Sequence, residues 1–94
     1  MIHKIVKKMK YLGLFESQYD LSEYWFGKGR SYVSSTKCRK RPISTEALLM
    51  FSSRLETTAQ LFSQSEYQSI RAKSQGMKLL AEEVRQEIDK RISI

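Results

Sequence analysis

The sequence predicts an all-α protein, a compact bundle of about five helices with a long helix at the C-terminal end. In most segments apolar residues recur at intervals of three and four, the period of a helix that is buried on one side. Serines stand where helices would begin, and glycine or proline where they would end. No segment shows the alternation typical of a strand, and no linker divides residues 1–94, so we expect a single domain.

The first helix is expected over residues 2–12. Its apolar residues share one face, and Gly13 follows at the position of a left-handed C-terminal cap. This face is narrow and lacks tryptophan, so we expect it to pack in the core rather than on a membrane. A second helix is expected from Ser17, with Asp20 as its capping partner, to a stop at Gly27.

The middle of the chain is expected to hold a short helix, a basic loop and a longer helix. The short helix begins at Arg30 or Ser31 and reaches Lys37. Residues 38–42 follow as a basic loop, whose proline prevents the helix from continuing. Ser44 is a candidate N-cap for the next helix. One face of that helix carries Leu48, Phe51, Ser52 and Leu55.

The last helix is expected to run from about residue 65 to residue 92. Ser65 and Gln68 form a candidate capping box, and Gly76 is the weak point, because glycine costs about 1 kcal/mol relative to alanine inside a helix. An apolar stripe runs along one side and consists of Met77, Leu80, Ala81, Val84, Ile88 and Ile92. This stripe either closes the core of its own chain or packs against a second copy in a two-fold dimer.

The charge of the chain is concentrated in its first part. The net charge is +7, and residues 1–42 carry ten basic and three acidic side chains, whereas residues 43–94 carry seven of each. The longest apolar run, residues 47–51, is far shorter than the roughly 20 residues of a membrane span. The single cysteine and the absence of a secretory signal pattern predict a cytoplasmic protein.

The inventory of side chains argues against an enzyme. His3 is the only histidine, so neither a histidine-centred triad nor a two-histidine metal site is available. Cys38 has basic neighbours but no histidine base beside it, and we interpret it as a bystander thiol. Acidic residues of the last helix alternate with basic ones as on an ordinary charged face. We therefore expect no catalytic residue, no metal and no cofactor.

Residues 17–55 resemble the lambda-repressor/Cro-like (XRE-type) helix-turn-helix domain. The shared features are a short helix, a glycine turn, a second short helix, a basic loop with proline and another capped helix. The matching residues are Ser17, Gln18, Leu21, Ser22, Gly27, residues 30–34, Pro42, Ser44, Leu48, Ser52 and Leu55. Residues 20–27, with Ser31 and Tyr32, also look like a family of small uncharacterised bacterial and phage proteins.

One spacing departs from the helix-turn-helix pattern. The family usually has five residues from the leucine of its first motif helix to the turn glycine, whereas Leu21 and Gly27 are six apart. Either the turn carries one extra residue or Phe26 extends the helix.

The resemblance implies a sequence-specific protein that binds duplex DNA, such as a small repressor-like regulator of transcription from a bacterium, phage or plasmid. Residues 30–37 would then be the recognition helix, with Val33 and part of Tyr32 facing the core. The side chains that would read bases are Arg30, Ser31, Ser34 and Ser35. Those that would contact phosphates are Lys28, Lys37, Arg39, Lys40 and Arg41.

The alternative is a protein–protein module, such as a phage- or plasmid-encoded inhibitor or adaptor that uses the same fold without DNA readout. It is motivated by aromatic residues crowded into a short region, which with arginine make interface hot spots. These are Tyr19, Tyr24, Trp25, Phe26 and Tyr32. For Trp25 we favour packing in the core.

Overall fold

The all-α fold class is confirmed by a computed structural model, which describes residues 1–92. Every regular element in this range is helical. In chain order the elements are α1 (Ile2–Leu12), α2 (Gln18–Asp20), the π-helical segment η1 (Leu21–Trp25), α3 (Tyr32–Arg39), α4 (Thr45–Ser63) and α5 (Gln68–Ile92).

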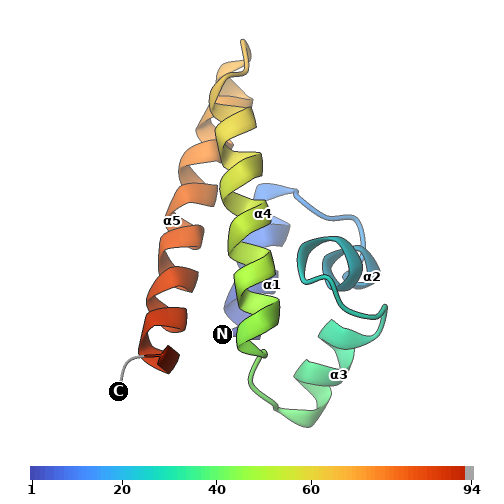
Figure 1. The fold of residues 1–94 in the computed structure, drawn as a ribbon. Coiled ribbons are helices and arrows are strands. Elements are labelled where there is room, and N and C mark those ends of the chain that lie inside the picture. Colours follow the sequence, from blue (N-terminus) through green and yellow to red (C-terminus); the bar gives the residue numbers. More distant parts are fainter. Residues whose placement is uncertain (93–94) are drawn as a thin grey trace.

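Two long helices form the frame of the molecule. α4 and α5 lie side by side and antiparallel, joined by a short turn at the end that projects beyond the other helices (Figure 1). α1 lies behind this pair, and α2 and α3 lie beside the end of α4 at which that helix begins (Figure 1). None of the helices within residues 1–92 has the length and apolar character needed to cross a membrane.

Local capping explains where the first helices begin and end. Gly13 has a left-handed backbone with a φ of 67°, and its N–H donates to the carbonyl of Lys10 at the end of α1. The hydroxyl oxygen of Ser17 accepts the N–H of Asp20 at 3.3 Å, at the start of α2. Ser44 is the N-cap of α4, as expected from the sequence.

Two predicted boundaries are wrong. α5 begins at Gln68 rather than Ser65, whose hydroxyl oxygen accepts the N–H of Tyr67 ahead of the helix. α3 includes Cys38 and Arg39, which were expected in the basic loop. The proline restricts only the residue before it, so α3 continues until Lys40, whose left-handed backbone with a φ of 53° ends it.

The six-residue spacing before Gly27 is explained by the π-helical segment. In η1 the carbonyl of Leu21 accepts the N–H of Phe26, five residues later, at 3.1 Å. A π turn holds one residue more than an α turn, so the extra residue extends the helix rather than the turn. Phe26 consequently enters the core, where it is 1% exposed.

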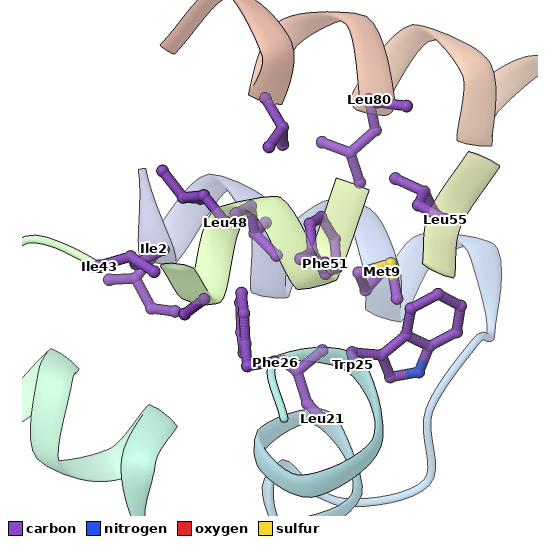
Figure 2. Packing of buried hydrophobic residues seen from close by; sticks show 14 of the residues in the cluster. Ile2, Met9, Leu21, Trp25, Phe26, Ile43, Leu48, Phe51, Leu55 and Leu80 are labelled. Atoms are coloured by element: carbon purple, nitrogen blue, oxygen red, sulfur yellow. The ribbon is translucent and has the colours of Figure 1, made fainter. Parts of the chain in front are cut away.

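The core lies where α1, α4 and α5 meet the end of η1. Phe26 stacks on Phe51 of α4 with ring centroids 5.1 Å apart, and Trp25 packs at 6.0 Å from the same ring (Figure 2). Trp25 is 4% exposed, so its expected role in the core is confirmed. On α1, Ile5 and Met9 are fully buried, which places the apolar face of this basic helix inside the protein.

The apolar stripe of α5 closes the core of its own chain. Its buried members are Met77, Leu80, Ala81, Val84 and Ile88. Ile92, which we had included in the stripe, is exposed. The buried five are not free to meet a second copy in the folded chain, so a dimer would need another surface.

Gly76 is a contact point between α5 and α1, not merely a weak point of the helix. A Cβ added at Gly76 would lie 2.8 Å from Cδ2 of Leu12. The absence of a side chain therefore allows the end of α1 to approach α5 closely.

Candidate nucleic-acid interface

A buried serine joins η1 to α3. The hydroxyl of Ser22, in η1, donates to the carbonyl of Gln18 at 2.8 Å and accepts the N–H of Val33 at 3.0 Å. The N–H of Val33 lies in the first turn of α3, where helix geometry provides no partner, and the N-cap Ser31 makes no side-chain capping bond. Ser22 thus caps α3 from a different element.

The two sides of α3 differ sharply in character. Val33 and Thr36 are buried, and half-buried Tyr32 packs its ring against Phe26 at a centroid distance of 5.9 Å. The opposite side carries only small side chains: Ser31, Ser34 and Cys38 are exposed, and Ser35 is half-buried. Nothing bulky on this side would keep another molecule away from the helix backbone.

Arg30 lies just before α3 and contacts side chains of α2 and η1. Its guanidinium lies 4.6 Å from the centre of the Tyr19 ring, and its Nε lies 3.8 Å from a carboxylate oxygen of Glu23. Nearby, the hydroxyl of Ser34 donates to the side-chain oxygen of Gln18 at 3.1 Å. The Arg30–Glu23 pair and the Ser34–Gln18 hydrogen bond are both exposed, so a ligand can replace these two contacts at little cost.

The five predicted phosphate-binding residues separate into two groups. Lys37, Arg39, Lys40 and Arg41 follow one another around the end of α3, and within residues 1–92 none of them forms an ion pair. Lys28 lies in the glycine turn instead, with its Nζ 3.4 Å from a carboxylate oxygen of Glu46. The end of α3 is therefore the stronger positive surface.

The aromatic cluster that motivated a protein–protein module is largely internal. Trp25 and Phe26 are buried, and Tyr32 is half-buried. Tyr19 and Tyr24 remain about half exposed. Each of these two rings lies under an arginine guanidinium at 4.6 Å from the ring centre.

Arg91 holds the loop between α3 and α4 in place, a role that is not predicted from the sequence. From the last turn of α5 its guanidinium donates to the carbonyl of Ile43 and lies 3.4 Å from the hydroxyl of Thr45, which fastens the loop behind α3. Glu87, one turn earlier on α5, lies 3.5 Å from Nε of Arg91. A basic residue in the last turn of a helix is common, so no local pattern distinguishes this one.

Fold and surface together define a small all-helical domain whose α3 presents small side chains next to a group of cations. The chain belongs to the family described as "Family of unknown function (DUF6626)", which it matches over residues 2–93. Comparison with curated proteins and with solved structures found no match.

Proposed function

We propose that the protein is a helix-turn-helix regulator that binds duplex DNA in a sequence-specific way, with α2 and η1 as the first motif helix and α3 as the recognition helix. The observation that carries the proposal is the outward side of α3, where small side chains stand beside four cations that form no ion pair within residues 1–92: Lys37, Arg39, Lys40 and Arg41. A major groove admits a helix, and short side chains let the helix lie deep in it.

Under this proposal the base contacts come from Arg30, Ser31, Ser34 and Ser35. Arg30 is the best candidate for specific readout, since a guanidinium can bind the O6 and N7 atoms of guanine together. To do so it must leave Glu23 and Tyr19, and its 71% exposed side chain makes that rearrangement inexpensive.

The phosphate contacts come from Lys37, Arg39, Lys40 and Arg41, with a weaker contribution from Lys28. Cations that neutralise phosphates release counterions, so each contact adds to the salt dependence of binding. Lys28 contributes less because Glu46 competes for its ammonium group. A regulator of this kind acts on DNA by occlusion or recruitment without catalysis, in the cytoplasm of a bacterial cell.

The decisive experiment is selection from a pool of random duplex DNA, repeated at two salt concentrations. We expect an enriched motif, and weaker binding at the higher salt concentration. Binding that does not change between low and moderate salt would contradict the electrostatic part of the proposal. Failure to enrich any sequence, together with capture of a protein partner from the source cell, would favour the protein–protein module with its exposed Tyr19 and Tyr24.

Single variants separate the two kinds of contact. Arg30→Gln should relax the sequence preference, and a good bidentate contact accounts for about 1–3 kcal/mol of discrimination. Arg39→Gln or Lys40→Gln should weaken binding to all sequences and reduce the salt slope by about 0.9 each. Lys78→Gln is the matched control, because it removes the same charge from an exposed position on α5.

A two-fold dimer also belongs to this proposal, because helix-turn-helix proteins commonly bind two half-sites one helical turn apart. The interface would lie outside the buried stripe of α5. An enriched palindrome would indicate two copies on the DNA. Sedimentation that shows a strict monomer at tens of micromolar would remove the dimer in free solution.

A further inference from the structure

A hollow of about 280 Å³ lies between α3 and the beginning of α4, next to the basic loop. It is lined by the side of α3 that adjoins the small-residue face and by the loop that leads into α4. Its polar lining residues are Tyr32, Ser35, Thr36, Arg39, Arg41 and Ser44. Ligand pockets for drug-sized molecules usually exceed about 300 Å³, so this hollow suits a small group.

Every polar side chain in this lining can donate a hydrogen bond, and no carboxylate is among them. The hydroxyl oxygen of Tyr32 accepts the N–H of Ser44 at 3.0 Å, and that of Ser44 accepts the N–H of Ala47 at 3.2 Å. Neither bond uses the hydrogen of the hydroxyl, so each of these hydroxyls can still donate. Arg39 and Arg41 add two positive charges, so the lining is complementary to an anion.

Thr36 brings a further hydroxyl to the hollow. The residue is 6% exposed and lines the hollow. Its hydroxyl oxygen is not among the fully buried side-chain atoms that lack a partner, so solvent reaches it from the hollow. A ligand oxygen in the hollow would replace solvent as its hydrogen-bond partner.

We propose that this hollow is a binding site for a phosphate group, held by Arg39 and Arg41 and by the hydroxyls of Thr36, Ser35 and Ser44. The free oxygens of a phosphate group, three in a monoester and two in a DNA diester, suit a lining whose polar side chains are all donors. The N-terminal end of the 19-residue helix α4 adds positive potential next to the site. The phosphate comes either from a DNA backbone or from a small phosphorylated molecule in solution. The site itself does not depend on DNA binding.

The test is a titration of the full chain with sodium phosphate, against sodium chloride at matched ionic strength, followed by amide NMR. We expect saturable shifts at the amides of Ser35, Thr36 and Ser44. Arg39→Gln and Arg41→Gln should each weaken phosphate binding by about tenfold or more, as expected for loss of a charge-assisted hydrogen bond.

Lys78→Gln is the matched control, since it removes the same charge from an exposed position on α5 outside the lining. It should leave the affinity within about twofold. Shifts that do not saturate, or that weaken equally in Lys78→Gln and Arg39→Gln, would overturn the site in favour of general screening. Thr36→Val adds a second measurement: it should lower phosphate affinity without lowering the melting temperature, and a strongly destabilised variant would show that the hydroxyl has a structural partner.

A final arm adds a short duplex at low salt to the phosphate-loaded protein. If the duplex displaces phosphate from the amides of Thr36 and Ser44, the hollow holds a backbone phosphate. If duplex and phosphate bind together, the ligand is a small phosphorylated molecule. A protein that binds no DNA would contradict the proposed function, and the phosphate titration would still decide the site.

Discussion

The buried hydroxyl of Ser22 is expected to determine how firmly α3 is attached to the rest of the molecule. Ser22→Ala removes the acceptor of the Val33 N–H and leaves that donor buried. The carbonyl of Gln18 keeps a backbone partner, since the N–H of Leu21 also points to it. One orphaned donor is thus the main consequence of the substitution.

The magnitude follows from this single loss. A buried donor without a partner costs about 1–3 kcal/mol, and alanine returns up to roughly 0.5 kcal/mol through its higher helix propensity. We therefore expect Ser22→Ala to lower the free energy of unfolding by about 0.5–3 kcal/mol. With a urea m-value of about 1–3 kcal/mol/M for a small domain, the unfolding midpoint should fall by roughly 1 M.

Urea unfolding followed by circular dichroism measures this change, and amide hydrogen exchange locates it. Protection of the Val33 amide should fall in Ser22→Ala more than protection in α4 or α5. Ser34→Ala is the control, because it removes an exposed hydroxyl bonded to Gln18 and should change stability by less than about 0.5 kcal/mol. A loss below 0.5 kcal/mol for Ser22→Ala, with the Val33 amide still protected, would refute the assignment of Ser22 as the cap of α3.

Three further predictions concern contacts elsewhere in the molecule. Gly76→Ala should destabilise the protein, because the added Cβ would lie 2.8 Å from Leu12, although alanine normally favours a helix by about 1 kcal/mol relative to glycine. In a Leu12→Ala background the same Gly76→Ala change should stabilise the protein. Equal shifts of the urea midpoint in both backgrounds would rule out the close contact. The hydrogen bond from Arg85 holds the pKa of Glu56 below its usual value, so this pair stabilises the fold above the unfolded pKa of about 4.3 and loses that contribution as the pH falls through the folded pKa. Arg85→Gln should raise the Glu56 pKa in an NMR titration and flatten the acid side of the curve of stability against pH. An unchanged Glu56 titration would show that Arg85 does not cause the lowered pKa. Arg91→Gln should increase amide exchange in the loop before α4 while leaving α1 protected, and unchanged exchange in that loop would mean that Arg91 does not fasten it.

The parts of the fold that were predictable from the sequence are those set by near neighbours. Gly13, Ser17 and Ser44 act on backbone groups within three or four residues of themselves, so their positions mark helix ends directly. The spacing of apolar residues likewise predicts which side of α4 and α5 is buried. Ser65 was misleading because its hydroxyl bonds a local turn, which competes with helix capping for the same side chain.

The contacts that hold α3 in place were not predictable in the same way, because their partners are far apart in the chain. Ser22 and Val33 are 11 residues apart, and Arg91 and Ile43 are 48 apart. Neither separation leaves a periodic pattern. The six-residue spacing before Gly27 did carry a signal, but the sequence alone left open whether the helix or the turn absorbs the extra residue.

α3 depends on these contacts because it is a poor helix by itself. It has eight residues, several of them serine, threonine or valine, whereas isolated helices below about 12–15 residues are marginal in water. Its stability and orientation must therefore come from contacts with the rest of the chain. Besides the packing of Val33 and Tyr32 on the core, these are hydrogen bonds of Ser22 at its first turn, of the Tyr32 hydroxyl at the start of α4 and of Arg91 on the loop behind it. Of the outward serines, Ser34 bonds the Gln18 side chain, and because that bond is exposed it adds little to this support. Changes on the outward side of α3 can consequently alter what the protein binds at little cost in stability, whereas changes at these three hydrogen-bonded contacts should affect stability and binding together.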